Sequence, residues 1–341
     1  MRRILLPQHI SEHPAPGAGV VLSCDGLSMG TTWRARLVAE PGRLAALRQG
    51  LQQQLDAVVR QMSHWEPDSD LARFNRAPAG SWHTLAPAFF DVLSFAMEVQ
   101  RDSGGAYDPC AGALVNRWGF GPDGRFDQPG FHAPDDAAVA ALLAARAGGP
   151  VLLEHGTRRA RQPGGVLLDL ASVAKGYGVD CLARYLERQG IHHYLVEVGG
   201  ELRGAGSKPD GQPWWVALEQ VGDQAPTASA PGEMVLALHG LAVATSGDYR
   251  RYFNLGDCRF SHTLDPRSGR PIGHAVASVT VVHTSCMAAD AWSTALTVLG
   301  PEAGLALAEA RGLAARLLVR DGSGDGLREL LSTQLSRMLE P

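Results

Sequence analysis

The sequence lacks any hydrophobic run long enough to cross a membrane as a helix. No stretch approaches the roughly 18 apolar residues that a spanning helix needs. The apolar residues 4–6 near the start are also too few for the core of a signal peptide. We therefore expect no transmembrane segment and a cytoplasmic location for the chain as given, or a periplasmic one if an upstream start was missed.

An excess of positive charge is also missing. The chain has 31 Lys and Arg residues against 35 Asp and Glu residues, which gives a formal net charge of -4. Proteins that bind nucleic acid usually carry a basic face or stripe, because they must neutralise phosphates. The charge balance therefore argues against a nucleic-acid partner.

Cysteine is scarce and widely spaced. The five cysteines form no C-x-x-C pair, which argues against a zinc ribbon and against a thioredoxin-like redox site: Cys24, Cys110, Cys181, Cys258 and Cys286. An odd number of scattered cysteines fits a reducing compartment, or small residues that fill a core. The sequence also has no internal repeat.

Helix and strand patterns alternate along most of the chain. Apolar residues at steps of three and four predict a first helix over 42–62, and alternating or β-branched runs predict strands. Further helices are expected at 87–102, 135–146, 175–189, from 290 to 299 and on to 311, and strands at 166–170, 193–198, 214–218, 234–238, 277–283 and 315–319. This mixture favours an α+β fold with mainly antiparallel sheets.

This pattern predicts one folded domain over residues 26–323. Residues 1–25 are expected to be a loose N-terminal extension, and residues 324–341 a polar helical C-terminal tail. The Pro- and Ala-rich residues 219–233 are expected to form a loop.

The segment from Asp169 to Tyr177 has the pattern of a strand that turns into a helix. Its acid, small residues and Lys175 predict a place where backbone N–H groups and an ammonium meet an anion such as phosphate. The alternative is a capped helix with a solvated lysine.

Two other segments combine glycine with polar groups after a strand. Gly199 and Gly200 let a ligand approach the backbone, and Thr245, Ser246 and Gly247 offer hydroxyls beside a glycine. Ordinary polar turns are the alternative in both places. The paired glycines do not form a G-x-G-x-x-G motif, so a Rossmann site is unsupported.

The last two informative segments carry a histidine and a pair of oxygen ligands. His262, three residues before an Asp-Pro turn, is a candidate general base or phosphate contact, or a polar surface residue. Asp290 and Thr294 share one face of a helix, and their oxygens suit Mg²⁺. The alternative is that Asp290 caps that helix.

Together and in this order, these segments resemble the ApbE family, the FAD:protein FMN transferases. The resemblance runs from residue 26 to about residue 300. It also rests on the motifs Met29-Gly30-Thr31, Met62-Ser63-His64-Trp65-Glu66-Pro67 with Asn75, and Gly105-Ala106-Tyr107-Asp108-Pro109.

The resemblance implies a set of functional residues. FAD, as substrate, would contact Met29, Trp65, Ala106, Tyr107, Asp108, Asp169, Lys175 and Leu264, with Trp65 next to a ring system. Asp290, Thr294 and the main-chain carbonyl of Ser172 would hold Mg²⁺. The resemblance also implies two interlocked subdomains like those of a tunnelling fold, with FAD in the cleft between them.

The reaction implied is transfer of FMN from FAD to a Thr or Ser hydroxyl of another protein, with release of AMP. Lys175 and Asp290 would assist it electrostatically, and His262 would accept the proton of the hydroxyl. The acceptor expected is a flavoprotein, by analogy a membrane-associated electron-transfer subunit. A Mg²⁺-dependent FAD pyrophosphatase and a non-catalytic flavin-binding protein are the alternatives.

The sequence departs from the family pattern at three positions near these motifs. Cys110 stands where a threonine is usual, and Thr263 and Trp292 stand where aliphatic residues are usual. None of them removes a predicted ligand.

Overall fold

A computed structural model describes residues 2–10, 19–146, 149–221, 232–249, 251–256, 258–322 and 326–340. Its internal contacts divide the chain into two units. Unit 1 comprises Met1–Asp56, Lys175–Gly247 and His274–Pro341, and unit 2 comprises Ala57–Ala174 and Asp248–Gly273. The expected domain over 26–323 therefore holds parts of both units. Most of the expected loop at 219–233 lies outside the described residues.

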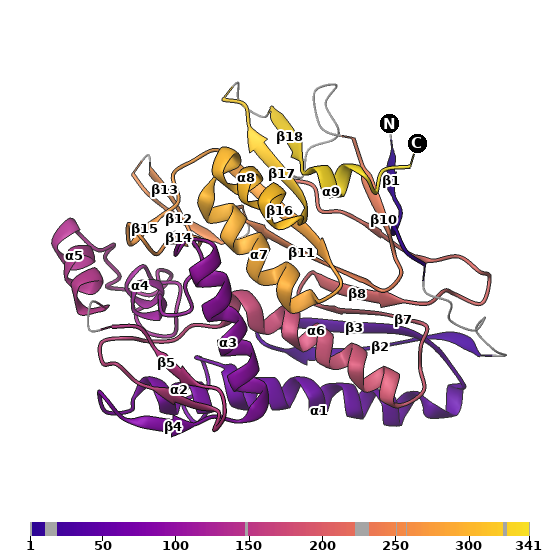
Figure 1. Ribbon diagram of the computed structural model, residues 1–341, viewed down its shortest axis with the longest axis horizontal. Helices are drawn as coiled ribbons and strands as arrows, with labels where there is room; N and C mark the ends of the chain where they lie inside the picture. Colours follow the sequence, from indigo (N-terminus) through magenta and orange to yellow (C-terminus); the bar gives the residue numbers. More distant parts are fainter. Residues whose placement is uncertain are drawn as a thin grey trace. The chain divides into compact units, whose positions relative to one another are not determined.

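Unit 1 is built on an eight-stranded sheet (Figure 1). Every neighbouring pair of strands in this sheet is antiparallel, which confirms the expected α+β class. In spatial order the strands are β18 (Leu327–Leu331), β17 (Ala314–Arg320), β16 (Val276–His283), β11 (Leu241–Gly247), β8 (Glu201–Ala205), β7 (Tyr194–Val198), β3 (Thr31–Ala39) and β2 (Val20–Ser28).

Helices cover one face of this sheet. The helices are α1 (Leu44–Met62, preceded by the 3-10 turn Pro41–Arg43), α6 (Ala171–Arg188), α7 (Cys286–Leu299) and α8 (Pro301–Arg311). Leu51 of α1 and Leu182 of α6 share a buried apolar cluster with Leu37 and Val196 of the sheet. Helix α7 packs on β11 and β16, and α8 packs on α7 and β17. Side chains alternate between the two faces of a sheet along each strand, so the side chains of the residues adjacent to Leu37 and Ala242 point to the opposite face of this sheet.

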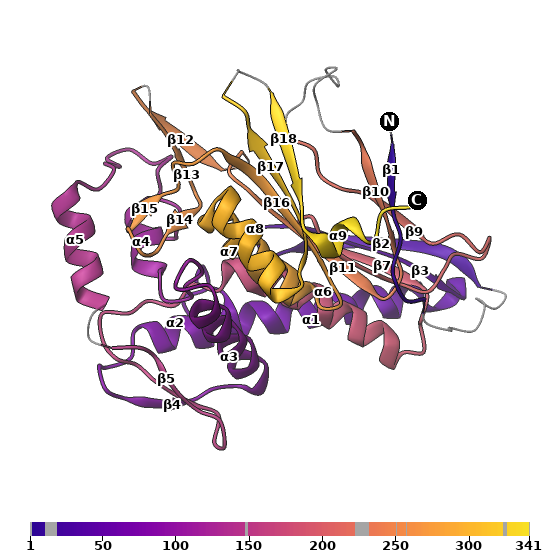
Figure 2. The same cartoon turned by 45° about the horizontal axis from the view of Figure 1, so that its top comes forward.

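The opposite face is covered by a three-stranded sheet, in the order β1 (Arg3–Leu5), β10 (Met234–Leu238) and β9 (Trp214–Ala217), and by α9 (Thr333–Ser336). Val38 and Val243 of the large sheet join Trp214, Leu236 and other residues in a second apolar cluster. Figure 2 shows β1 beside β10, with the two ends of the chain close together. Leu6 donates its N–H to the carbonyl of Met338 at 2.7 Å.

The two ends of the chain differ from expectation. Within residues 1–25, Arg3–Leu5 pairs with β10 and residues from Val20 onward form β2. Within residues 324–341, Leu327–Leu331 forms the edge strand β18 and only Thr333–Ser336 is helical. Their pairing with distant strands is a long-range effect that sequence periodicity does not report.

Unit 2 combines helices with small sheets. The helices are α2 (Asp70–Asn75), α3 (Pro87–Asp102), α4 (Gly112–Arg117) and α5 (Asp136–Ala145). The strands are β4 (Trp82–Thr84), β6 (Arg159–Arg161) and β5 (Leu152–Glu154) in one sheet, and the hairpins β12 (Tyr252–Leu255) with β13 (Cys258–Ser261) and β14 (Leu264–Asp265) with β15 (Arg270–Pro271). Stacked aromatic rings, Trp118 on Phe260 and Phe253 on Phe126, form part of its core.

The strand expected at 166–170 is wrong. This segment makes only an isolated bridge, between Leu167 and Ala111. The amide of Asn75 takes the place of a neighbouring strand, because its oxygen accepts the N–H of Leu168 at 2.7 Å and its nitrogen donates to the Leu168 carbonyl at 2.9 Å. A side chain that satisfies both backbone groups removes the need for a ladder.

The helix predictions are mostly confirmed. Those at 42–62, 87–102 and 135–146 match α1, α3 and α5, and Asp135 caps α5 by accepting the N–H of Ala138. The helices expected from residues 175 and 290 each begin four residues earlier, at 171 and 286. In the described part of the chain, no helix is long and apolar enough to cross a membrane.

Burial in unit 1 predicts a specific stability difference. Leu55 is fully buried between α1 and the sheet, whereas Leu27 is 75% exposed. Leu55→Ala should lower the free energy of unfolding by about 2–5 kcal/mol, because it removes buried apolar surface and leaves a cavity. Leu27→Ala removes the same atoms and should change it by less than about 0.5 kcal/mol. Urea denaturation of both variants checks this, and equal effects would contradict the packing described.

Candidate active site

The predicted site residues fall in both units. Unit 1 holds Met29, Lys175, Gly199, Gly200, Thr245, Ser246, Gly247, Asp290 and Thr294, and unit 2 holds Trp65, Ala106, Tyr107, Asp108, Asp169, Ser172, His262 and Leu264.

Asp290 is buried in α7 and is held by a backbone group of α6. Its side chain is 3% exposed, and Oδ2 accepts the N–H of Gly176 at 2.9 Å. The N-cap of α7 is Ser285, whose hydroxyl accepts the N–H of Ala288. The capping role considered for Asp290 is therefore wrong, and a buried carboxylate in the second turn of a helix calls for another function.

The contact between α6 and α7 requires glycine at position 176. A Cβ atom there would lie 2.3 Å from the carbonyl oxygen of Cys286 and 2.8 Å from Cβ of Asp290. Both neighbours are rigid, so the missing side chain is what lets the Asp290 carboxylate reach the Gly176 N–H.

Asp180 ties three elements of unit 1 together. Its Oδ1 accepts the N–H of Cys286 at 3.0 Å, and its Oδ2 accepts the Ser285 hydroxyl at 2.8 Å and the Met287 N–H at 3.1 Å. Arg203 of β8 donates to Oδ1 at 2.6 Å. A carboxylate at the first turn of α7 also suits the helix dipole. Sequence reasoning missed Asp180, because nothing in its own helix marks a contact 105 residues away.

Lys175 forms an ion pair with Glu201, the residue after the paired glycines. Lys175 lies three residues after Ser172, where non-helical backbone angles interrupt the start of α6. Its side chain is 32% exposed, whereas that of Glu201 is 2% exposed. Burial raises the pKa of Glu201 to about 7 although Lys175 lowers it, and burial also raises the pKa of Asp290. Two buried carboxylates thus act on one ammonium.

The hydroxyls predicted from the sequence lie next to the metal candidates. Ser246 at the end of β11 has its Oγ 2.9 Å from Oγ1 of Thr294 and 2.8 Å from Oγ of Ser293. The Thr245 side chain contacts β16 instead, with its Oγ1 2.8 Å from Oγ1 of Thr280. Of the two adjacent hydroxyls, the structure brings Ser246 to Thr294, one helical turn after Asp290.

Gly199 and Gly200 form the two-residue turn of the β7–β8 hairpin, with φ angles of 61° and 102°. The two glycines therefore lie in a turn between two strands, and this turn brings two motifs together. A Cβ at Gly199 would lie 2.9 Å from Cγ2 of Thr31, in the Met29-Gly30-Thr31 motif. Met29 itself reaches α6, since its Cε would lie 3.0 Å from a Cβ at Gly178.

These donors fit a hard divalent cation. Asp290 supplies a buried carboxyl group and Thr294 supplies a hydroxyl, which are ligand types that Mg²⁺ takes together with phosphate and water. Within the described ranges, no group of three or more His, Cys, Asp or Glu side chains is placed to coordinate a metal ion. Ser172, the third predicted ligand, lies in unit 2 and has non-helical backbone angles inside α6 (φ −91°, ψ 15°). The three-ligand site stays a prediction.

In unit 2, the Asp169 carboxylate is held by His64 and by the backbone N–H of Ala171. Its Oδ1 lies 3.3 Å from Nδ1 of His64 and accepts the N–H of Ala171 at 2.8 Å. Burial lowers the pKa of His64, but the charge of Asp169 outweighs burial and the net shift is upward. Burial likewise raises the pKa of Asp169, and His64 and the Ala171 N–H outweigh it, so the net shift is downward. The pair therefore favours imidazolium beside carboxylate.

Trp65 follows His64 and is 44% exposed, with the two rings 5.4 Å apart. An exposed indole beside a polar pair is well placed to pack against a planar ligand. His64 belongs to the motif quoted above, but its pairing with a residue more than 100 positions away was not foreseen.

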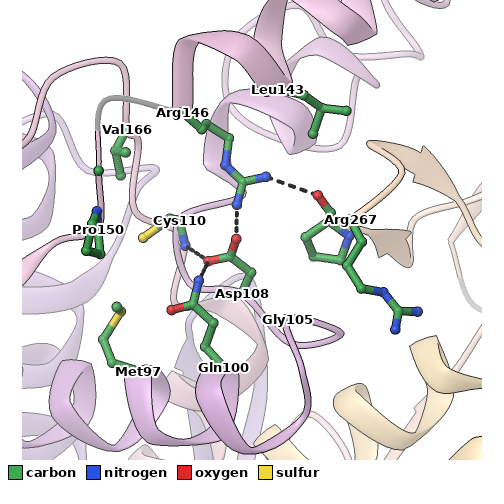
Figure 3. A pocket seen from close by; sticks show the side chains of 12 residues that line it. Met97, Gln100, Gly105, Asp108, Cys110, Leu143, Arg146, Pro150, Val166 and Arg267 are labelled. Carbon is green, nitrogen blue, oxygen red and sulfur yellow. Dashed lines mark hydrogen bonds and ion pairs between the residues drawn. The ribbon is translucent and has the colours of Figure 1, made fainter.

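Asp108 is fully engaged inside unit 2 (Figure 3). Its Oδ1 accepts the side-chain amide of Gln100 at 2.7 Å and the N–H of Cys110 at 2.8 Å, and Arg146 forms an ion pair with its Oδ2. Arg146 also donates to the carbonyl of Pro266 at 3.2 Å. Arg146 therefore links the Asp108 turn to the turn that follows Leu264. The carboxylate is 4% exposed, so contact with FAD through its backbone suits the structure better.

A pocket of about 340 Å³ borders this cluster. Its polar lining is Gln100, Asp108, Arg146 and Arg267, and its apolar lining is Met97, Leu143, Pro150, Val166 and Pro266, with Gly105, Gly149 and Cys110 completing it. Burial raises the pKa of Cys110 to about 12, so this thiol stays protonated.

Three other predicted FAD contacts in unit 2 are buried. Ala106 and Tyr107 are each 1% exposed, and Leu264 is 7% exposed within an apolar cluster. Their FAD contacts stay predictions.

His262 is oriented by a main-chain carbonyl. Its Nδ1 lies 3.0 Å from the carbonyl oxygen of Arg251, which also accepts the His262 N–H at 3.0 Å. A carbonyl can only accept, so the proton of a neutral ring sits on Nδ1 and the lone pair on Nε2. That tautomer suits a general base.

The contact between α6 and α7 makes Gly176 a test position. Gly176→Ala should lower the free energy of unfolding by about 1–3 kcal/mol, because the new methyl group collides with the Cys286 carbonyl and with Asp290. Gly42→Ala is the matched control, since a Cβ there meets nothing within 4 Å. Thermal and chemical unfolding of both variants provide the measurement. A Gly176→Ala protein as stable as Gly42→Ala would show that the two helices are not in this contact.

Known proteins show the same sequence pattern and fold. The model of the ApbE family matches residues 29–317. The chain is 38% identical over 316 residues to the FAD:protein FMN transferase of Klebsiella pneumoniae, covering 91% of this chain and 88% of that protein. It is 35% identical over 337 residues to the protein of that name from Escherichia coli, covering 98% and 92%.

Two solved structures agree with this. The apo form of the flavinyl transferase ApbE from Pseudomonas stutzeri matches with a TM-score of 0.83 and 36% identity, over 94% of this chain and 97% of that one. The flavin transferase ApbE from Vibrio cholerae matches with a TM-score of 0.82 and 35% identity, over 94% and 99%. The family match spans most of the chain, and the protein belongs to the ApbE family.

Proposed function

We propose that this protein transfers the FMN half of FAD to a Thr or Ser hydroxyl of an acceptor protein in a Mg²⁺-dependent reaction and releases AMP. The relatives named above are FAD:protein FMN transferases. The observation that carries the proposal is the arrangement in unit 1, where Lys175, buried Asp290 and the hydroxyl of Thr294 lie around α6 and α7. An ammonium beside hard oxygen ligands is suited to a phosphate group and its cation.

The proposed reaction is a phosphoryl-type transfer in which one P–O bond forms and one breaks. The acceptor oxygen forms a bond to the FMN phosphorus, the pyrophosphate P–O bond breaks, and AMP leaves with the electron pair. The proton of the hydroxyl must be accepted by a base. The chemistry that bound Mg²⁺ supplies is neutralisation of the negative charge on the pyrophosphate.

The residues of this chain have distinct parts in that scheme. Asp290 and Thr294 would hold the cation, with the carbonyl of Ser172 as a third ligand. Lys175 would donate hydrogen bonds to phosphate oxygens. His262, with its lone pair on Nε2, would accept the proton of the attacking hydroxyl. Trp65 would pack against one of the ring systems of FAD.

The remaining predicted contacts are divided between the two units. In unit 1, the turn at Gly199 and Gly200 exposes backbone near Thr31, and Met29 packs beside α6. In unit 2, Asp169 and the backbone of Asp108 are each fixed by a partner side chain. Each unit thus presents a fixed set of groups for FAD.

For the acceptor, we propose a flavoprotein subunit of a membrane-associated electron-transfer system, by analogy with the family. We also propose that the chain as given acts in the cytoplasm.

Product analysis tests the proposed function. The purified protein, incubated with FAD, Mg²⁺ and a candidate acceptor, should leave flavin covalently attached to the acceptor and AMP in solution. Free FMN with AMP would instead show a pyrophosphatase, in which water replaces the hydroxyl. Unchanged FAD with every acceptor tried would favour a flavin-binding protein without catalysis.

Asp290 should be essential for its charge rather than its shape. In Asp290→Asn the amide oxygen can still accept the Gly176 N–H, so the fold should persist while the metal loses an anionic ligand. Turnover should fall by about 10²-fold or more, with partial recovery at high Mg²⁺.

Thr294 provides the matched comparison for that titration. Thr294→Ser keeps the hydroxyl and should stay near wild type, whereas Thr294→Ala should lose less activity than Asp290→Asn. Wild-type turnover of Asp290→Asn at every Mg²⁺ concentration would end the metal-site proposal.

His262→Asn tests the general base. The asparagine amide can still donate to the Arg251 carbonyl, but it cannot accept a proton as imidazole does. The rate of transfer should fall by about 10²- to 10⁴-fold, with FAD affinity changed only a few-fold. His132→Asn, at an exposed histidine of the same unit, is the control. Unchanged turnover in His262→Asn would remove this residue from the mechanism.

A further inference from the structure

Glu201 is a buried acid that has no direct part in the proposed reaction. It is the first residue of β8, directly after the turn at Gly199 and Gly200, and is 2% exposed. One carboxylate oxygen, Oε1, accepts from Nζ of Lys175. The other, Oε2, is buried and has no hydrogen-bond partner among the described residues.

The position of Glu201 in the sheet is one that normally carries an apolar residue. Glu201 is paired with Val198 across the hairpin, so the two side chains point to the same face. Val198 is fully buried in the apolar cluster under α6. A carboxylate in such a place, with one oxygen left without a hydrogen bond, is unfavourable for stability. Packing alone therefore does not account for an acid at 201.

The ion pair with Lys175 explains why an acid stands at position 201. The ammonium is the cationic partner of Glu201, and Asp290 is the second buried carboxylate whose charge acts on both. If a divalent cation binds Asp290, it will repel the nearby ammonium and favour conformations in which the partly exposed Lys175 turns into solvent. A fixed anion on the opposite side of the ammonium counters that repulsion.

We propose that Glu201 is a positioning residue for FAD: it anchors the ammonium of Lys175 so that its other N–H groups meet the phosphates of FAD beside the bound cation. This inference rests on the proposed function. Glu201 itself touches neither FAD nor metal, and it acts through Lys175.

A purely structural Glu201 would behave differently. In that case its loss would weaken FAD binding by disturbing the hairpin, whether or not Lys175 is present. If Glu201 acts through Lys175, removing Glu201 should not weaken FAD binding further in a variant that already lacks the Lys175 ammonium. The two cases separate in a double-mutant cycle.

The experiment measures equilibrium FAD affinity, from flavin fluorescence at saturating Mg²⁺ and without acceptor protein, for wild type, Glu201→Gln, Lys175→Met and the double variant. Lys175→Met should weaken binding roughly 10- to 100-fold, as expected for loss of a charge-assisted hydrogen bond. Glu201→Gln should weaken it roughly 5- to 20-fold. The double variant should bind within about 3-fold of Lys175→Met alone. A double variant weakened by the product of the two single effects would overturn the proposal.

Controls keep the outcome clear. Lys208 is the other lysine of the chain, and Lys208→Met should leave FAD affinity unchanged. Thermal unfolding without FAD should show Glu201→Gln folded, because glutamine has the same shape and no charge to bury. If that variant fails to fold, Glu201→Asp takes its place in the cycle, and the same non-additivity is expected. Failure of wild type to bind FAD would refute the proposed function, whereas an additive cycle with wild-type binding intact would refute only the role of Glu201.

Discussion

The unit-1 part of the site depends on one hydrogen bond, from the Gly176 N–H to the buried Asp290 carboxylate. The bond requires α6 and α7 to approach until no side chain fits at position 176. Asp180 holds the same two helices at the first turn of α7 and connects them to β8 through Arg203. Because these contacts fix the backbone, the carboxylate has one defined position in the core, which is what a metal ligand needs.

Charge is the second constraint, and it follows from the first. Burying Asp290 and Glu201 near one lysine raises the pKa of both carboxyl groups, because burial disfavours their charged forms. A cation bound beside these groups would favour their charged forms. The same region offers the hydroxyls of Ser246 and Thr294. A site that is strained electrostatically without its ligand is typical of functional sites rather than of structural cores.

Unit 2 is organised by polar side chains that hold loops, rather than by a large sheet. Asn75 replaces a missing strand for residue 168, His64 orients Asp169, and Arg146 joins the Asp108 turn to Pro266. Each of these side chains satisfies backbone or charged groups that would otherwise be buried without partners. This gives the motif loops defined shapes although regular secondary structure is short there.

The sequence by itself determined the α+β class, most helices and strands, and the motifs that identify the family, because these depend on local periodicity and on residue types at short spacing. It did not determine that β18 and β1 join sheets, that Ser285 rather than Asp290 caps α7, or that Asp180, Arg146 and Glu201 pair with Arg203, Asp108 and Lys175. Only the tertiary structure decided these, since each is a contact between residues far apart in the chain. Lys175 and Glu201 show the difference well: both stand in recognisable motifs, but their pairing exists only because the β7–β8 hairpin folds against α6.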